Sequence, residues 1–496
     1  MNHTRKRFIV LPRHGLNFHT AAATNELQPI IELKKVKTLR TMKCGALVVL
    51  TTDEIAASIN LASRKFIVEE DVLHFPFSDP LLQKAVSLSA AAIPLKCKVT
   101  GPENEPVEAA EVVFQSVVTG IAFKGKTNTR GIAEVNVIGK TFRILVFPHH
   151  GYWSKDGGIY DAENNDMAII QLERLIAPGT YDWGHIAMEA HLVESEFRGQ
   201  GIKVGIIDTG IQADPPHEDL RVARGLNCVT GDFPDNQERA PNSWKDDVDQ
   251  HGSHCAGIVA ALENEIGITG HAPQASLVGY KVFPVGMGAS SADIADAIDF
   301  AIEDGVDVIN LSLGARTKSI TIEQAIQRAF DAGIVCCCAA GNDNSTVSYP
   351  AALNVENVVS VAGIGKFGTY PSSSAHTLAE TNKVSQDGQF FRYFQSNFGD
   401  VDGEPKVDVC APAVAVTSTV KGGYASWNGT SMAAPHVTGT LALILQSHPE
   451  IRNISGQEKA SVAISLLKRT CRSLGLHAIY QGAGLPSDFC AVKMKA

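Results

Sequence analysis

A serine stands where a run of small residues meets an apolar run, within Gly429–Gly439 (GTSMAAPHVTG). The apolar run Leu441–Leu445 follows, so Ser431 is expected at the mouth of a buried helix. There its hydroxyl would lie near unpaired backbone N–H groups and the positive end of the helix dipole, which favour the negative charge that develops in acyl transfer. Thr430 or Ser431 could instead merely cap the helix, because both residue types are common caps.

Two further stretches supply groups that would activate a serine. The apolar run Ile202–Ile207 is typical of a buried parallel strand, and Asp208 stands at its carboxyl end. His251 stands just before a run of small residues that predicts a helix. With Ser431 as nucleophile, His251 as the base that takes its proton, and Asp208 as the group that orients the imidazole, the three parts of a nucleophilic relay are present.

These motifs resemble those of the subtilisin-like serine proteases over roughly residues 180–488. The Asp-Thr-Gly, His-Gly-Thr-His and Gly-Thr-Ser-Met-Ala-Ala-Pro-His motifs are all there, with Ser253 in place of the usual threonine. The three residues also follow one another along the chain in the order Asp, His, Ser, which is the order in this family. The order therefore strengthens the resemblance but is not separate evidence for the catalytic roles. The resemblance implies a serine endopeptidase that forms an acyl-enzyme on Ser431. Asn342, after the strand-like run 334–340, matches the oxyanion asparagine and would act with the Ser431 backbone N–H.

The resemblance also implies a groove in which a substrate peptide pairs as an added strand. One edge would come from residues 308–314 and the other from residues 285–289, where Gly286 and Gly288 leave the edge open. The first specificity pocket would be walled by two short segments, namely Ser312, Leu313 and Gly314 on one side and Ala339, Ala340 and Gly341 on the other. Small walls without a nearby carboxylate predict broad cleavage after large apolar or aromatic residues.

No cofactor is required for this chemistry, and a structural calcium ion is the one ion that the resemblance implies. Its ligands would come from an acid after the first motif and from the loop after the histidine helix, that is, from Asp219, Leu262, Asn264, Ile266 and Ile268. A solvated loop is the alternative interpretation. The acidic run Asp246–Asp249 predicts a surface loop rather than a metal site.

Two other classes of function compete with a serine endopeptidase. A catalytically silent peptide-binding module would use the same groove, but such a module has no need of all four catalytic groups. A metallopeptidase would use His251 and His254 as ligands, but their spacing is not His-Glu-x-x-His and no glutamate lies between them.

The first part of the chain, residues 5–77, predicts a ferredoxin-like α+β module. Its expected elements are strands at 7–11, 36–42, 45–50 and 65–70 and helices at 21–33 and 53–63. This order resembles the inhibitory propeptide of the same family. The module would then be an intramolecular inhibitor or folding assistant, with its tail near residues 72–77 in the groove. A generic α+β module without an inhibitory role is the alternative.

Residues 94–153 predict a small β-sandwich of prealbumin-like or immunoglobulin-like type, and residues 154–180 a linker. His149 and His150 are neighbours and would point to opposite sides of a strand, so a metal site is not expected there. In residues 180–488, strands alternate with helices, which predicts a doubly wound parallel sheet of the α/β class. Residues 364–396 look like an insertion without an assignable function.

Composition narrows the partners and the compartment. The net charge of −10 and pI near 5.9 argue against nucleic acid or an anionic membrane as a partner, which leaves protein or peptide substrates. The apolar stretch before Pro12 is too short for the core of a signal peptide, and no run approaches the eighteen or so residues of a membrane span. Ten cysteines, three of them on one predicted buried strand, fit reduced thiols in the cytoplasm. Export by a non-standard route is the alternative.

Overall fold

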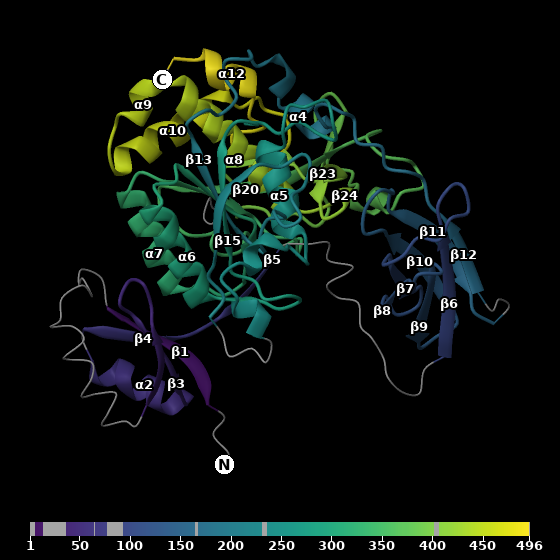
Figure 1. Ribbon diagram of the computed structural model, residues 1–496, viewed down its shortest axis with the longest axis horizontal. Helices are drawn as coiled ribbons and strands as arrows, with labels where there is room; N and C mark the ends of the chain where they lie inside the picture. Colours follow the sequence, from purple (N-terminus) through teal and green to yellow (C-terminus); the bar gives the residue numbers. More distant parts are fainter. Residues whose placement is uncertain are drawn as a thin grey trace.

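The computed structural model describes residues 5–12, 36–63, 65–76, 93–163, 167–230, 236–400 and 406–495. Figure 1 shows three parts. A small N-terminal module lies beneath helices α6 (Ser291–Glu303) and α7 (Ile320–Asp331), a β-sandwich lies at the far side of the molecule, and an α/β body lies between them. None of the helices in these ranges is long and apolar enough to cross a membrane.

The α/β body is built on an eight-stranded sheet of order β14-β15-β13-β17-β19-β20-β21, with β22 paired to β20. Its strands are β13 (Lys203–Asp208), β14 (Val222–Asn227), β15 (Ser276–Lys281), β17 (Val308–Leu311), β19 (Val335–Ala339), β20 (Val358–Lys366), β21 (Phe390–Arg392) and β22 (Val409–Pro412). Strands β14 and β15, which follow β13 in the chain, lie on one side of it, and β17 and the later strands lie on the other. The carboxyl end of β13 is therefore a topological switch point, where ligands bind in such sheets.

The sheet is mixed rather than wholly parallel, which corrects the prediction in one respect. Strand β21 pairs antiparallel with β20, because the chain turns back on itself within the segment 364–396. The remaining pairs in this sheet are parallel. The predicted α/β class and the doubly wound connection therefore hold, and the antiparallel edge comes from the segment that looks like an insertion in the sequence.

Helix α8 (Thr430–Ser447) lies at the centre of the body and begins beside the switch point. Its residues from Thr430 to Leu445 are all buried, because the helix packs against α5 (His251–Ala260) and against the sheet. Helix α10 (Gln457–Thr470) covers it from outside, together with the short helices α9 (Pro449–Arg452) and α12 (Asp488–Lys493). The short helix α4 (Trp183–Ala187) contacts β22, and α11 (Ala478–Gln481) contacts β20 and β22. A helix buried all round needs the uninterrupted run of small and apolar residues that its sequence supplies.

The N-terminal module is a four-stranded antiparallel sheet of order β2-β3-β1-β4 with one described helix. Its elements are β1 (Lys6–Pro12), β2 (Lys37–Thr41), β3 (Leu47–Thr51), α2 (Asp53–Ala62) and β4 (Phe66–Glu70). Thr52 caps α2 by accepting a hydrogen bond from the Ile55 amide. The helix predicted at 21–33 lies outside the described residues.

The sandwich has two sheets, β11-β10-β7-β8 and β12-β6-β9, around one apolar core. Its strands are β6 (Ile93–Thr100), β7 (Glu111–Ser116), β8 (Ala122–Lys126), β9 (Ile132–Val137), β10 (Thr141–Phe147), β11 (Lys155–Asp161) and β12 (Met167–Gln171). The predicted linker 154–180 is therefore wrong in its first part, and the sandwich extends beyond residue 153 to Gln171. Gly157 and Gly158 interrupt the alternation in β11, which is why the pattern of a strand was absent from the sequence.

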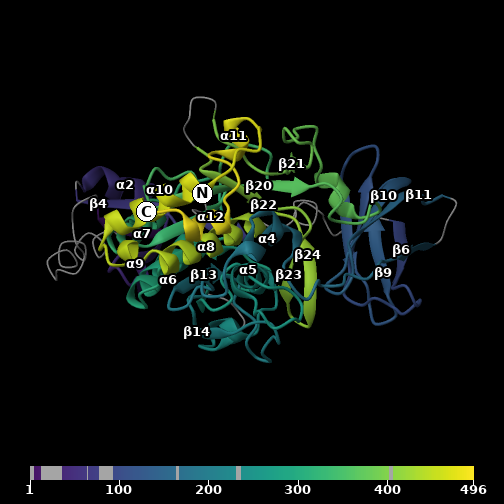
Figure 2. The same ribbon diagram turned by 90° about the horizontal axis from the view of Figure 1, so that it is seen from above.

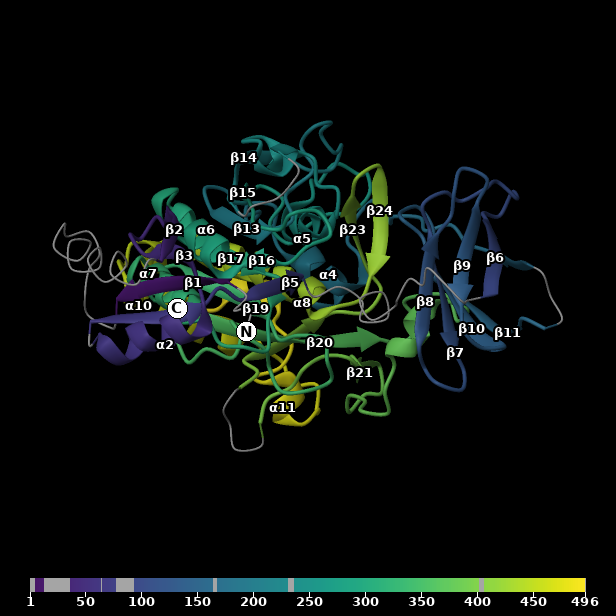
Figure 3. The ribbon, with the colours of Figure 1, turned by 90° about the horizontal axis from the view of Figure 1, so that it is seen from below.

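The segment 364–396 has a structural role, because it carries contacts to the sandwich. Ser374 lies 3.0 Å from Ser154 between hydroxyl oxygens, and Lys155 donates to the Ser373 hydroxyl at 2.7 Å. In Figures 2 and 3 the sandwich lies beyond the hairpin of β23 (Val416–Val420) and β24 (Gly423–Trp427), on one side of the α/β body.

Candidate active site

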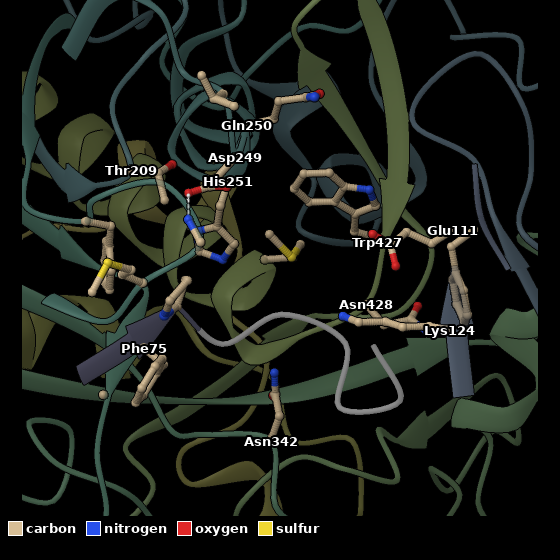
Figure 4. A pocket seen from close by; sticks show the side chains of 18 of the residues that line it. Phe75, Glu111, Lys124, Thr209, Asp249, Gln250, His251, Asn342, Trp427 and Asn428 are labelled. Atoms are coloured by element: carbon tan, nitrogen blue, oxygen red, sulfur yellow. Dashed lines mark hydrogen bonds between the residues drawn. The ribbon is translucent and has the colours of Figure 1, made fainter. Parts of the chain in front are cut away.

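Four predicted residues meet at one edge of the sheet. Asp208 is the last residue of β13, and Asn342 follows β19, so both stand at carboxyl ends of parallel strands. His251 is the first residue of α5, and Ser431 is the second residue of α8. Figure 4 shows His251 and Asn342 facing the same cavity, which has a volume of about 950 Å³.

Asp208 contacts the Nδ1 side of the His251 imidazole. The His251 Nδ1 atom lies 2.8 Å from the Asp208 carboxylate, and both side chains are buried. Burial alone would lower the pKa of His251, but the charge and the hydrogen bond of Asp208 outweigh it, so the pKa of this imidazole is raised above its ordinary value. This pair leaves Nε2 as the ring nitrogen that can exchange a proton with a nucleophile.

The Ser431 hydroxyl donates a hydrogen bond to the Ser312 carbonyl oxygen at 3.0 Å. The Ser312 hydroxyl in turn donates to the Ser431 carbonyl at 2.8 Å, so the two serines are joined twice. The His251 Nε2 atom is buried and has no hydrogen-bond partner among the described residues. Ser431 and His251, the predicted nucleophile and base, therefore stand at the same site without a hydrogen bond between them.

The side chain of Asn342 is oriented by Thr430, the residue before Ser431. Its side-chain oxygen accepts from the Thr430 amide and from the Thr430 hydroxyl, both at 3.0 Å. Because two donors hold the oxygen, the amide nitrogen turns the other way, into the cavity, as Figure 4 shows. The sequence suggests Thr430 only as a helix cap, so its part in positioning Asn342 was missed.

The groove is occupied by the chain itself. Strand β5 (Leu73–Pro76) lies between β16 (Ala289–Ser290) and β18 (Leu313–Gly314) and pairs antiparallel with both. His74 is opposite Ala289 on one side, and Pro76 is opposite Leu313 on the other. The residues just after the N-terminal module thus take the position in which a peptide substrate would add a strand.

The two glycines predicted along this groove differ in what they do. A Cβ atom on Gly288 would lie 2.9 Å from the His74 carbonyl oxygen, so the absence of a side chain permits the close approach of β5. Gly286 has a φ of +67° and lines the cavity, with its amide donating to Asp249 at 3.1 Å.

The predicted walls of the first specificity pocket are all buried, but they do not all face the cavity. Gly314 lines the cavity. The Gly341 backbone amide instead donates a hydrogen bond to the Thr430 hydroxyl at 3.1 Å, on the side of Asn342 away from the cavity. The other predicted wall residues pack within the body and are not part of the cavity lining, namely Ser312, Leu313, Ala339 and Ala340. Arg316 and Asp343 also line the cavity and form an ion pair at 3.3 Å, so charge is present near the groove where the sequence predicted none.

The sandwich forms the opposite wall of the cavity. Glu111, Lys124, Lys126 and His149 line it, and His149 makes a hydrogen bond to Gln250, the residue before the catalytic histidine. Figure 4 shows Phe75 of β5 on one side of the cavity and Glu111 and Lys124 on the other, with His251 and Asn342 between them. No local pattern in the sequence signals this wall, because it depends on how two domains dock.

The N-terminal module docks on helix ends through carboxylates. The Glu69 carboxylate accepts from the backbone amides of Ile320 and Thr321, both at 2.8 Å, where α7 begins. Asp71 accepts from the Ala292 amide at 3.3 Å in the first turn of α6. These N–H groups have no partner within their own helices, and the helix dipole favours a negative charge there.

The residues predicted for calcium lie together around the buried carboxylate of Asp219. Asp219 is buried and accepts from the Ile268 amide at 3.0 Å and from the Tyr424 hydroxyl at 3.3 Å. Asn264 turns its oxygen to the Ile266 amide at 3.0 Å, and Leu262 donates its own amide to the Asp219 carbonyl at 3.0 Å. The other carboxylate oxygen of Asp219, Oδ1, is buried without a hydrogen-bond partner among the described residues, and burial raises the pKa of this carboxyl group to about 7. Calcium, which takes oxygen ligands, therefore stays a prediction for these residues.

The acidic run before His251 is only partly the predicted surface loop. Asp247 is fully buried and accepts from Ser253 twice, from the amide at 2.8 Å and from the hydroxyl at 2.6 Å. The same serine hydroxyl accepts from the Gln212 amide at 2.8 Å. Asp247 therefore fixes the start of α5, and the serine that replaces the family's threonine keeps the hydroxyl that this contact needs.

Comparison with known proteins agrees with the geometry. A family model described as the subtilase family matches residues 199–484. Subtilisin DY from Bacillus licheniformis is 35% identical over 313 residues, which are 62% of this chain and 96% of that protein. Alkaline elastase YaB from Bacillus sp. (strain YaB) is 33% identical over 338 residues, 67% of this chain and 76% of that protein. Subtilisin NAT from Bacillus subtilis subsp. natto is 36% identical over 295 residues, 58% of this chain and 65% of that protein.

Because the family match covers more than half of the chain, the chain belongs to the subtilase family. It is a subtilisin-like serine endopeptidase, and its substrates are accordingly proteins or peptides.

Proposed function

We propose that Ser431 cleaves peptide bonds through an acyl-enzyme. The Ser431 Oγ atom attacks the scissile carbonyl carbon while its proton passes to His251 Nε2, and Asp208 stabilises the imidazolium that forms. The oxyanion receives hydrogen bonds from the Asn342 side-chain amide and the Ser431 backbone N–H. Collapse of this intermediate expels the amine with the proton from His251, and a water molecule then hydrolyses the acyl-enzyme by the same steps.

The observation that carries this proposal is that Asp208 and His251, whose carboxylate oxygen and Nδ1 atom are 2.8 Å apart, lie at the same site as a serine at the start of a buried helix. A serine-directed phosphonate should label the processed enzyme at Ser431 and stop hydrolysis of a quenched peptide. Full hydrolysis by the Ser431→Ala variant, or loss of wild-type activity to a chelator alone, would contradict the proposal.

The N-terminal module is proposed to be an intramolecular inhibitor that is released by self-processing. Support comes from β5, which fills the groove as a third antiparallel strand, and from Glu69 and Asp71, which anchor the module on α6 and α7. The residue after Pro76 in the sequence is Phe77, which lies outside the described residues. Cleavage after Phe77 would agree with the proposed preference for large apolar residues before the scissile bond, and a peptide-library profile dominated by Lys or Arg would refute that preference.

The sandwich is proposed to receive the leaving-group side of the substrate. Strand β5 occupies one half of the groove, and the sandwich wall lies on the other side of the catalytic groups (Figure 4). Lys126 pairs with Glu111 at 3.2 Å on this wall, and Lys124 and Lys126 together leave it with an excess of positive charge, which favours acidic residues in the substrate after the scissile bond.

A cytoplasmic location is proposed from the cysteines. All ten are free in the structure, and most are buried. Cys336, Cys337 and Cys338 have exposures of 0% and act as small apolar residues in β19. Recovery of the active enzyme with disulfide bonds from the culture medium would contradict this location.

A further inference from the structure

Three histidines form a buried cluster outside the catalytic site. His185 lies on α4, His271 lies in the loop before β15, and His436 lies on α8, five residues after the nucleophile. One ring nitrogen from each lies within 4.8 Å of the others, and the three residues have exposures of 0%, 3% and 0%. The proposed hydrolysis uses none of them.

Hydrogen bonds at the outer side of two rings fix which nitrogen faces inward. His185 Nε2 lies 3.0 Å from the Ile258 carbonyl oxygen, which can only accept, so Nδ1 carries the lone pair. His271 Nδ1 bonds to the Asp488 carboxylate, which leaves Nε2 as the inward lone pair. Asp488 is itself held by the Thr440 hydroxyl at 2.6 Å. A carboxylate or carbonyl behind each imidazole is the usual support of metal-binding histidines.

The inner side of the cluster lacks the hydrogen bonds that such burial requires. His185 Nδ1 and His436 Nε2 are buried without a partner among the described residues. The His271 Nε2 and His436 Nδ1 atoms are 2.6 Å apart, so two nitrogens face each other with a single proton between them. An unsatisfied buried nitrogen destabilises the fold, so some other group is expected to satisfy these two atoms.

Two glycines make room for the three rings. A Cβ atom at Gly184 would lie 2.6 Å from the His436 ring, and one at Gly439 would lie 2.4 Å from the Cβ atom of His271.

We propose that His185, His271 and His436 bind one Zn²⁺ ion, with Asp488 as the supporting carboxylate. Three imidazoles suit zinc and related transition metals and do not suit Ca²⁺ or Mg²⁺, which prefer oxygen ligands. A tetrahedral zinc ion with bonds of about 2.0–2.1 Å separates its ligand nitrogens by roughly 3.3 Å. The His271 and His436 nitrogens would therefore move apart by less than about 1 Å, and the proton between them would shift to His436 Nε2 or leave.

The site would join three parts of the chain that are distant in sequence. Helix α4 comes before the catalytic motifs, α8 carries Ser431, and Asp488 begins α12 near the end of the described chain. The ion would thus hold the nucleophile helix between two peripheral segments. This role is independent of the proposed hydrolysis, because the cluster stabilises the fold and does not contact the substrate groove.

The first test is metal content of the full-length chain without a histidine tag, in the Ser431→Ala background to prevent self-digestion. After exposure to Zn²⁺ and dialysis, elemental analysis should find about one zinc per chain, and the His271→Gln variant should retain less than a tenth of that. His448→Gln is the matched control, because His448 is also buried and bonds through Nε2 to the Ala491 carbonyl at 2.9 Å, outside the cluster. The control should retain one zinc.

A second measurement decides the matter if His271→Gln fails to fold. The thermal midpoint of the Ser431→Ala chain should rise by roughly 2–4 °C at a zinc concentration a hundred times the dissociation constant. Bound Co²⁺ should show the strong visible absorption of a tetrahedral site. Absence of metal together with an unchanged midpoint would overturn the proposal, as would equal zinc content in His271→Gln and the parent.

Discussion

The hydroxyl of Ser431 is bonded to the carbonyl of Ser312 at 3.0 Å and not to the imidazole of His251. Ser312 directly precedes β18, which pairs with the chain's own strand β5. The nucleophile is thus held by the same segment that holds the occupied groove. We interpret the structure as a latent state in which the Asp208–His251 pair is complete and the last hydrogen bond of the triad forms when the Ser431 side chain rotates.

Self-processing should depend on the nucleophile and on the residue after β5. Wild-type protein should lose residues 1–77 on incubation, whereas Ser431→Ala should keep its full mass. Phe77→Asp should slow the reaction, because a charged residue fits an apolar pocket poorly. Intact mass measured over time checks these outcomes. A wild type that hydrolyses peptides at full length would show instead that the N-terminal module is a permanent part of the enzyme.

Removing the oxyanion donor should reduce turnover without unfolding the protein. Asn342→Asp keeps the oxygen that accepts from Thr430 but removes the amide that faces the cavity. The expected loss in kcat is about a hundred- to a thousandfold, which is the established magnitude for the oxyanion asparagine of subtilisin itself. Steady-state kinetics on the processed enzyme, beside its thermal midpoint, separate the two effects. An unchanged kcat would exclude Asn342 from the oxyanion site.

Activity should rise with pH at a midpoint above the ordinary histidine value of about 6.5. The Asp208 carboxylate raises the pKa of His251 despite burial, and His251 must be neutral to accept the proton of Ser431. The raised pKa of His251 also stabilises the folded protein at any pH below the pKa that this histidine has in the unfolded chain. This stabilisation is lost as the pH rises through the pKa of His251 in the folded protein. Asp208→Asn should move the acid limb of the kcat/KM profile to lower pH, because burial then dominates. An acid limb that does not move would mean that another group titrates.

Weakening the helix anchor of the module should speed its release. Glu69→Gln removes the negative charge at the start of α7, an interaction of about 0.3–2 kcal/mol, so dissociation after processing should be roughly two- to thirtyfold faster. The lag before peptide hydrolysis measures this rate. Glu70→Gln is the control, because Glu70 is exposed and pairs with Lys6 inside the module. Equal lags in the two variants would exclude the anchoring role of Glu69.

Charge reversal on the sandwich wall should change specificity and leave catalysis intact. Lys124→Glu with Lys126→Glu should lower kcat/KM for peptides with acidic residues after the scissile bond, by up to about fivefold per charge, and should leave neutral peptides unaffected. Lys96→Glu is the control, because Lys96 is exposed on the other sheet of the sandwich and does not line the cavity. An equal effect on all peptides would place the wall outside the substrate path.

The positions of the predicted catalytic residues in the fold could be derived from the sequence, because each residue has a local signature. Asp208 ends an apolar strand, His251 begins a helix of small residues, and Ser431 begins a buried one. Strand-end and helix-start positions follow from backbone periodicity, and the α/β order of the body follows from the alternation of these elements. The tail of the N-terminal module was placed in the groove by family resemblance, and β5 lies there.

Features that depend on long-range packing were not predictable from the sequence. His271 and His436 lie 165 positions apart and share no motif, yet their ring nitrogens are 2.6 Å from each other. The sandwich wall is equally invisible, because docking of one domain on another leaves no periodic pattern. The acidic run predicted a surface position for Asp247, since such runs are usually solvated, but two donors from Ser253 balance its burial.

The position of β5 has a kinetic consequence. The strand is covalently joined to a folded module on one side and to the rest of the enzyme on the other, so it competes with substrate at the effective concentration of a short tether, on the order of millimolar. Cutting one tether leaves the module held only by its own contacts, and dilution can then remove it. Activation would therefore behave as a change from an intramolecular to a bimolecular equilibrium, and the concentration of enzyme would decide how much of it is active.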